Sequence, residues 1–108
     1  RSRMVTINPL VLSKFRAALD ELYGSRIERV VLFGSRARGD AGEDSDYDVA
    51  VFLKELGDRW QEIDRLVEIE TDILWETGAV INALPFQAGA YRERTPLMHE
   101  IRREGFEL

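Results

Sequence analysis

The segment Asp46–Leu53 constrains the fold more than any other, because it is apolar on both faces beyond its two aspartates. Alternate residues of a strand point to opposite faces, so Asp46 and Asp48 would share one face with Ala50 and Phe52. The opposite face would carry Tyr47, Val49, Val51 and Leu53. A strand that is buried on both sides belongs to a sheet covered by helices. The segment therefore predicts an α/β fold.

Helix and strand signals alternate around this segment. Helices are expected at 9–23, after the cap Asn8, at about 58–77, before Gly78, and at 96–104, after the cap Thr95. Strands are expected at 27–33 and at about 79–84. The predicted fold is a small mixed sheet of about three to four strands packed against helices, in a single domain that spans residues 4–108.

The long helix expected at 58–77 carries both tryptophans, Trp60 and Trp75. Large aromatic side chains at helical spacing usually pack into a core, so we predict packing roles and no ligand for them. Its acidic residues are expected to form a solvated face, or a face that meets a basic partner. They are Glu62, Glu68, Glu70, Asp72 and Glu76.

A glycine–serine pair, Gly34-Ser35, follows the strand expected at 27–33. A glycine lets the backbone approach a phosphate closely, and the Ser35 hydroxyl could bind a terminal phosphate. Ser35 could also cap a short helical turn at 36–38, whose N–H groups would then face the anion. Arg36 and Arg38 could place guanidinium groups on a triphosphate, although arginines in a turn are more often solvated.

Asp46 and Asp48 would point the same way, with Cα atoms roughly 6.5 to 7 Å apart. Two carboxylates at that separation can bind a pair of divalent cations. An isolated Gly-Ser is usually a turn and an isolated Asp-x-Asp is usually solvated. Their joint occurrence beside two apolar strands indicates a site for a metal-bound nucleoside triphosphate.

The spacing Gly-Ser, ten residues, Asp, one residue, Asp resembles the motif of the minimal nucleotidyltransferases. This family (MNT) belongs to the DNA polymerase beta superfamily and includes the antitoxins of HEPN/MNT toxin–antitoxin pairs. The resemblance extends from about residue 8 to the last residue, and it implies the polymerase-beta-like nucleotidyltransferase fold. It also implies metal-dependent transfer of a nucleoside monophosphate, AMP from ATP, onto a hydroxyl of a protein partner. That acceptor would be a tyrosine of a HEPN toxin, in a hetero-oligomer whose toxin the modification silences.

The same resemblance assigns roles to individual residues. Asp46 and Asp48 would be the catalytic residues and would hold Mg²⁺ in a two-metal site. The nucleotide phosphates would be bound by Gly34, Ser35, Arg36 and Arg38.

One position departs from the family pattern. Many relatives carry a third carboxylate on a later strand, and the matching segment here offers Asn82 as its only polar residue. An amide oxygen can bind a cation, but it carries no charge and is a poor base near neutral pH. Asn82 is therefore a candidate metal ligand or a simple strand-end residue. Two alternatives to catalysis follow: an antitoxin that acts by binding alone, and a nucleotide-sensing module.

The composition of the chain excludes several kinds of partner and metal site. The 108 residues carry a net charge of −5, which argues against extended nucleic acid as the main partner. The chain has no cysteine, which suits a reducing cytoplasm, and its single histidine excludes a multi-histidine metal centre. No apolar run is long enough to cross a bilayer, so no membrane role is expected. Residues 1–3, before Met4, resemble an expression-tag remnant. The acceptor, the base preference and the number of nucleotides added stay open.

Overall fold

The computed structural model describes residues 8–39 and 46–108, so the expected tag remnant at residues 1–3 lies outside the described residues. The elements in chain order are α1 (Pro9–Tyr23), η1 (Gly24–Arg26), β1 (Ile27–Phe33), α2 (Ser35–Arg38), β2 (Tyr47–Leu53), α3 (Arg59–Thr77), β3 (Ile81–Gln87), η2 (Ala88–Arg92), α4 (Pro96–Glu104) and β4 (Phe106–Glu107).

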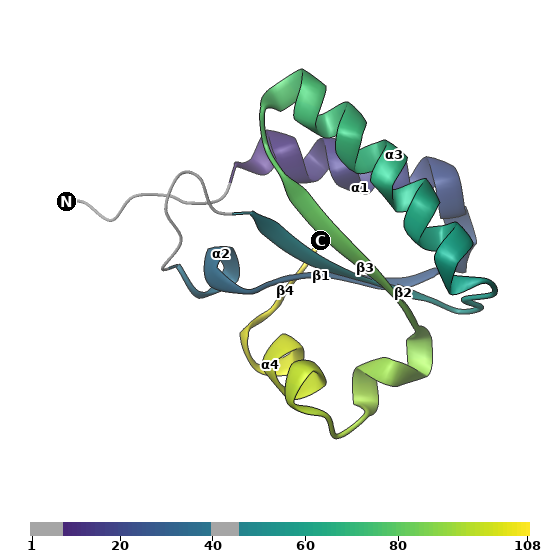
Figure 1. Cartoon of the computed structure of the whole chain (residues 1–108). Helices are drawn as coiled ribbons and strands as arrows, with labels where there is room; N and C mark the ends of the chain where they lie inside the picture. Colours follow the sequence, from purple (N-terminus) through teal and green to yellow (C-terminus); the bar gives the residue numbers. More distant parts are fainter. Residues whose placement is uncertain (1–7, 40–45) are drawn as a thin grey trace.

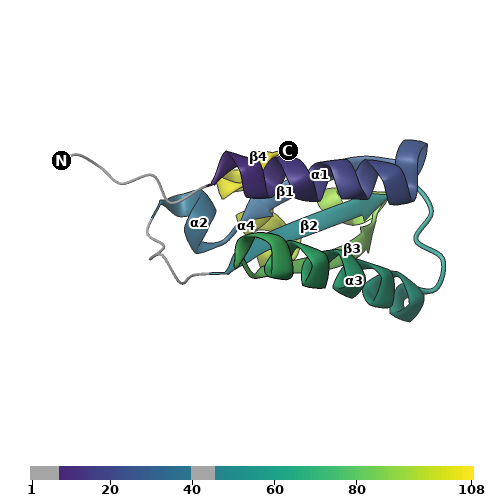
Figure 2. The ribbon, with the colours of Figure 1, turned by 90° about the horizontal axis from the view of Figure 1, so that it is seen from above.

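The described strands form one sheet in the order β3-β2-β1-β4. β1 runs antiparallel to both β2 and β4, whereas β2 and β3 are parallel. Helices α1 and α3 cover one face of the sheet and α4 lies against the other (Figure 1; Figure 2). The predicted mixed α/β fold is therefore confirmed. Among the described residues, no helix is both long enough and apolar enough to cross a membrane.

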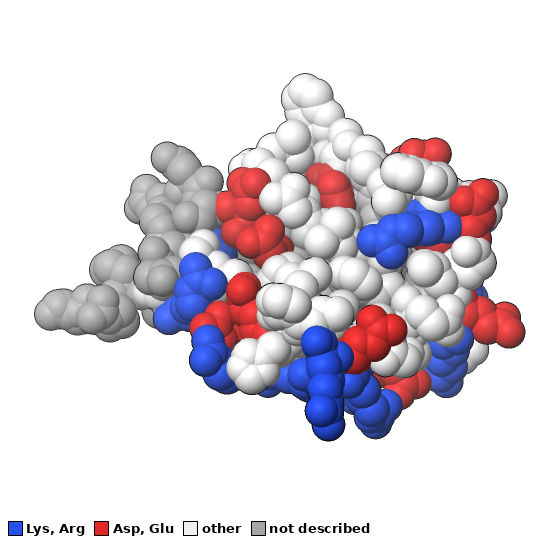
Figure 3. All heavy atoms as spheres, turned by 60° about the horizontal axis from the view of Figure 1, so that its bottom comes forward, with Lys and Arg blue, Asp and Glu red and all other residues white. Residues whose placement is uncertain are grey.

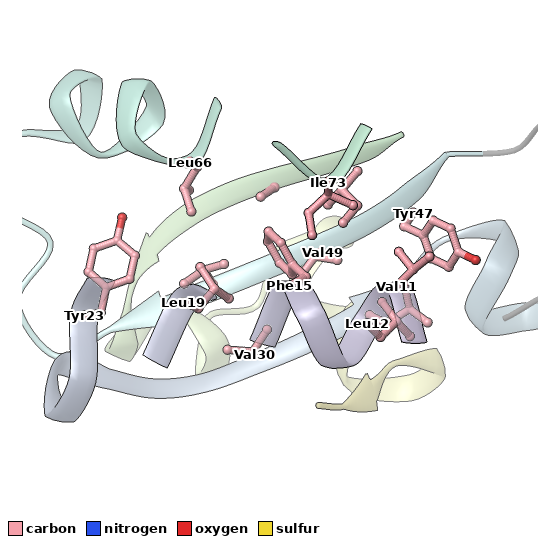
Figure 4. Close-up of a cluster of buried hydrophobic side chains, with 14 of the residues drawn as sticks. Val11, Leu12, Phe15, Leu19, Tyr23, Val30, Tyr47, Val49, Leu66 and Ile73 are labelled. Carbon is pink, nitrogen blue, oxygen red and sulfur yellow. The ribbon is translucent and has the colours of Figure 1, made fainter. Parts of the chain in front are cut away.

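Each face of the sheet has its own apolar core, as the alternation in β2 predicts. The larger core lies between the sheet and helices α1 and α3 (Figure 4). Its buried members are Val11, Leu12, Phe15, Leu19, Tyr23, Val30, Leu32, Tyr47, Val49, Val51, Leu53, Leu66, Ile73, Ile81 and Ala83. The smaller core, on the α4 side, consists of Val31, Phe33, Ala50, Phe52, Met98 and Ile101. The start of β2 thus presents its aspartate face on the α4 side.

The prediction that the two tryptophans pack in the core is wrong. Trp60 is 75% exposed and Trp75 is 85% exposed, because α3 turns Leu66 and Ile73 toward the sheet. At 3.6 residues per turn, the tryptophans fall on a different side of the helix from these two residues. The helix therefore keeps a large apolar surface in contact with solvent.

The expectation of a fully solvated acidic face on α3 is also wrong at Glu62, which is only 3% exposed. The Tyr23 hydroxyl donates a hydrogen bond to Glu62 Oε1 at 2.8 Å, and Arg26 Nη2 lies 3.1 Å from Glu62 Oε2. Burial raises the pKa of the Tyr23 hydroxyl far above its ordinary value, so it remains a donor. These contacts join the end of α1 to the start of α3.

Replacing Tyr23 with Phe is expected to lower the free energy of unfolding by about 1 to 2 kcal/mol, because a buried carboxylate then loses a hydrogen-bond donor. Urea unfolding followed by circular dichroism measures this change. Tyr91→Phe provides the control, since it makes the same chemical change at a tyrosine whose ring packs against Phe52 and Arg29, and it should cost less. An equal loss in both variants would show that the hydrogen bond from Tyr23 to Glu62 contributes nothing specific.

Candidate active site

The bend after β1 lies in direct contact with the carboxylate of β2. Phe33 pairs with Asp48 across the antiparallel strands, and Gly34 follows Phe33 with φ of 81°. A Cβ atom at Gly34 would lie 2.5 Å from Asp48 Oδ2, so only a glycine leaves room for this carboxylate. The two halves of the motif therefore meet at one end of the sheet.

The side chain of Asn82 lies beside the two aspartates. Asp48 pairs with Asn82 across the parallel strands β2 and β3, and Asp46 precedes β2 by one residue. Asn82 Nδ2 donates to Asp46 Oδ2 at 2.7 Å, and the Asn82 side chain also lowers the pKa of Asp48. Asn82 is thus a hydrogen-bond donor here, whereas a role as metal ligand would use its oxygen.

The carboxyl group of Asp48 carries an electrostatic penalty. Its partial burial raises its pKa above the ordinary value, and the nearby carboxylates of Asp46 and Glu100 raise it further. The hydrogen bond from Asn82 and the charge of Arg38 act in the opposite direction and lower the pKa. Because the negative charges of Asp46 and Glu100 disfavour the ionised form of Asp48, a cation bound beside these carboxylates would relieve their repulsion.

The remaining predicted site residues occupy different surroundings. Helix α2 begins at Ser35, with Gly34 as its N-cap, so the predicted capping role of Ser35 is wrong. Arg36 is 8% exposed, and its guanidinium lies over the Tyr47 ring, 4.1 Å from the ring centroid. Because Tyr47 belongs to the core beneath α1 and α3, Arg36 packs on the opposite face of β2 from Asp48.

Arg38 lies nearer the carboxylates, in contact with helix α4. Its Nη1 atom is 3.7 Å from Glu100 Oε2 and 3.6 Å from Glu104 Oε1. Figure 3 shows that acidic and basic side chains lie close together on this face of the molecule. Sequence reasoning missed Glu100 and Glu104, and their i, i+4 spacing on one helix face is the signal that could have found them.

The donor set fits a divalent cation that is shared with a nucleotide. In the part of the chain that the structure describes, no group of three or more His, Asp or Glu residues is arranged to hold a metal ion. Mg²⁺, however, is usually bound by one or two carboxylates, with substrate phosphates and water as the other ligands. Asp46 and Asp48 supply the carboxylates that such a site requires.

Comparisons with known proteins agree with this geometry. The sequence profile described as "Nucleotidyltransferase domain" matches residues 12–98. A protein of Methanocaldococcus jannaschii named "putative protein adenylyltransferase MJ0604" is 38% identical over 73 residues, which are 68% of this chain and 67% of that protein.

Solved structures of similar fold include two that bear on the chain as a whole. One, described as a "putative minimal nucleotidyltransferase", matches over 100% of both chains with a TM-score of 0.62 and 28% identity. Another is the complex of tri-AMPylated Shewanella oneidensis HEPN toxin with MNT antitoxin, matched over 94% of this chain and 71% of that chain. Its TM-score is 0.58 at 17% identity, a likeness that shows the fold. The shared fold and the contact between Gly34 and Asp48 agree with the profile match. The profile match shows that this chain belongs to the nucleotidyltransferase domain family, as its motif spacing predicts.

Proposed function

We propose that this protein is a Mg²⁺-dependent nucleotidyltransferase that transfers AMP from ATP to a tyrosine hydroxyl of a HEPN partner and so acts as an antitoxin. The observation that carries the proposal is the contact between the Gly34 bend and the Asp48 carboxylate, which supports a phosphate-binding role for the bend beside a cation-binding role for the carboxylate. The M. jannaschii relative named a protein adenylyltransferase and the solved HEPN–MNT complex support the choice of acceptor.

In the proposed reaction, the acceptor oxygen forms a bond to the α-phosphorus and the bond from that phosphorus to the bridging oxygen breaks. Pyrophosphate leaves in line with the attacking hydroxyl, whose proton passes to water. Bound Mg²⁺ would offset phosphate charge and polarise the α-phosphate. Asp46 and Asp48 hold the cation, and the backbone of Gly34 and Ser35 receives the β- and γ-phosphates.

Three further side chains complete the proposed site. Arg38 can offer its guanidinium to the triphosphate if it exchanges the carboxylates of Glu100 and Glu104 for phosphate oxygens. Asn82 keeps Asp46 oriented in the absence of a cation, since its amide donates to that carboxylate, and it stabilises the charged form of Asp48. Arg36 supports the bend by stacking on Tyr47.

The direct test incubates the purified protein with Mg²⁺, ATP labelled in its α-phosphate and a purified HEPN protein. Catalysis predicts label on the HEPN protein that disappears with EDTA and in the Asp46→Asn variant. A stable complex without label, unaffected by Asp46→Asn, would instead identify an antitoxin that acts by binding alone. ATP binding with neither label nor complex would identify a nucleotide-sensing module.

Asn82→Asp is expected to restore the third carboxylate that many relatives carry. Without a cation, the variant should unfold about 1 kcal/mol more easily, because a third negative charge replaces a donor beside Asp46 and Asp48. With Mg²⁺ it should be stabilised more than the natural chain, and transfer should become faster. Thermal unfolding with and without Mg²⁺ measures the first effect, and initial rates of labelling measure the second.

Asn82→Ala serves as the control for this prediction, since it removes the donor without adding charge. A variant Asn82→Asp that gains no extra stability from Mg²⁺ would show that residue 82 lies outside the cation site.

A further inference from the structure

The side of α3 that faces solvent carries an apolar stripe. We define the outer stripe as Trp60, Val67, Leu74 and Trp75, which are 75%, 47%, 44% and 85% exposed. Steps of seven residues place the first three on one line along the helix. The four side chains of the outer stripe together expose on the order of 500 Å² of surface, comparable with the largest patch of a typical monomer. Such a stripe, with a tryptophan near each end, has the composition of a binding hot spot.

We propose that the outer stripe binds a helix of the partner protein that is apolar on one face and carries Lys or Arg beside that face. The inference rests on the proposed function, because the partner is the protein to be modified. Seven-residue steps are the spacing with which two helices pack side by side.

The charges around the stripe select a basic partner. The exposed residues of α3 beside the stripe include the acids Asp64, Glu68, Asp72 and Glu76. Glu76 pairs with Lys14 of α1 at 3.6 Å, between two side chains that are both about half exposed or more. A partner with Lys or Arg beside its apolar face would complement these acids. Opposite charges around an interface accelerate association and discriminate between partners.

The same charges disfavour a second copy of this chain on the stripe. In an antiparallel pair of α3 helices centred at the level of Glu68, Glu68 would approach its own symmetry mate and Asp64 would approach Asp72 of the other copy. Like charges that face each other across an interface oppose association. The stripe therefore suits a different protein.

The edge of the sheet next to α3 is protected against strand addition. The outward N–H group of Ala83 donates to Glu70 Oε2 at 2.9 Å, and Pro85, two residues later, has no N–H group to offer. An added strand needs free backbone donors along the edge. The hydrogen bond to Glu70 and the proline therefore hinder the pairing of another strand with β3. A partner on this side would contact side chains of α3 instead.

The outer stripe is continuous with the candidate active site. Leu74 borders a small hollow of about 150 Å³ that is also lined by Val80 and Asn82. The amide of Asn82 in turn binds the carboxylate of Asp46. The end of α3 that carries Leu74 and Trp75 thus lies at the end of the sheet where β2 begins (Figure 1). A helix docked on the stripe would bring the partner to the edge of the catalytic carboxylates.

The test titrates a purified HEPN protein into the natural chain and into Trp60→Ser/Trp75→Ser, by isothermal calorimetry. We expect the affinity of the double variant to fall at least thirtyfold, roughly the effect of one hot-spot residue, with an unchanged circular dichroism spectrum and unchanged ATP binding. Phe106→Ser is the matched control, since Phe106 is a 51% exposed aromatic residue on β4, at the opposite edge of the sheet. Glu68→Lys should weaken binding several-fold, and added salt should weaken the binding of the natural chain.

The outcomes separate this inference from the proposed function. Equal affinity in the natural chain and the double variant would overturn the inference even if label still reaches the HEPN protein. Loss of affinity only in the double variant, with no label transferred by any variant, would uphold the docking surface and refute the catalytic proposal. A natural chain that does not bind the HEPN protein, or a dimer that Trp60→Ser/Trp75→Ser dissociates, would also overturn the inference.

Discussion

Asp48→Asn is expected to reduce nucleotidyl transfer by at least about a thousandfold while making the protein more stable. The loss of activity follows from the removal of a charge that holds the cation at the triphosphate, an effect of the size seen when one electrostatic contact to a transition state is deleted. Initial rates of labelling, with excess Mg²⁺ and ATP, measure it. Residual transfer within tenfold of the natural chain would exclude Asp48 from the site.

Asp48→Asn should raise the free energy of unfolding although it lowers activity, because the charged form of Asp48 destabilises the fold. Because the pKa of Asp48 is raised in the folded state, folding favours its neutral form. Its stabilising contribution is complete below about pH 4 and is lost as the pH rises through the folded pKa. At pH 7 and without Mg²⁺, Asp48→Asn should therefore raise the free energy of unfolding by about 0.5 to 2 kcal/mol.

Thermal unfolding between pH 3 and pH 7 measures this difference between Asp48→Asn and the natural chain. The difference should shrink toward acid pH, where both side chains are neutral. Asp46→Asn is the matched control, because Asp46 is exposed and its carboxylate should contribute less to stability. A stability gain for Asp48→Asn that is constant with pH would contradict the electrostatic explanation.

The helix ends were predictable because their signals are local. Asn8 accepts from the N–H group of Leu10, and Thr95 accepts from that of Met98, each beside a proline that starts its helix. Such a cap depends on residues within one turn, so the sequence alone contains it. Strand β4 has two residues and pairs with Val31 and Leu32. Its formation therefore depends on where the end of α4 places the following residues relative to β1. No local pattern encodes that placement.

The side of α3 that packs on the sheet was not predictable from periodicity. The helix carries two apolar lines, one with Leu66 and Ile73 and one with Trp60 and Val67, and each has helical spacing. Only the position of the sheet decides which line is buried. The contact of Arg38 with Glu100 and Glu104 has the same origin, since it joins segments that the sequence does not place side by side. The Gly34–Asp48 contact was predictable because Gly34 follows β1 and Asp48 lies near the start of β2, two strands that pair as neighbours.

Gly34→Ala is expected to lower transfer at least about a hundredfold and the free energy of unfolding by about 2 to 4 kcal/mol. Two terms contribute. The backbone at Gly34, with φ of 81° and ψ of −159°, lies in a region that is essentially restricted to glycine and costs other residues about 1 to 3 kcal/mol. The new Cβ would also lie 2.5 Å from Asp48 Oδ2 and would displace the carboxylate that holds the cation. A displacement of 1 Å in a catalytic group can reduce the rate about a hundredfold.

Gly39→Ala separates the general cost of a positive φ from the contact with Asp48. Gly39 has φ of 84° at the end of α2, but a Cβ there would meet no atom of the described residues within 4 Å. This variant should lose about 1 to 2 kcal/mol of stability and keep most of its transfer activity, because no side chain moves. Urea unfolding and labelling rates, measured on both variants, make the comparison. Equal losses of activity in Gly34→Ala and Gly39→Ala would show that strain in the loop, and not the position of Asp48, controls the reaction.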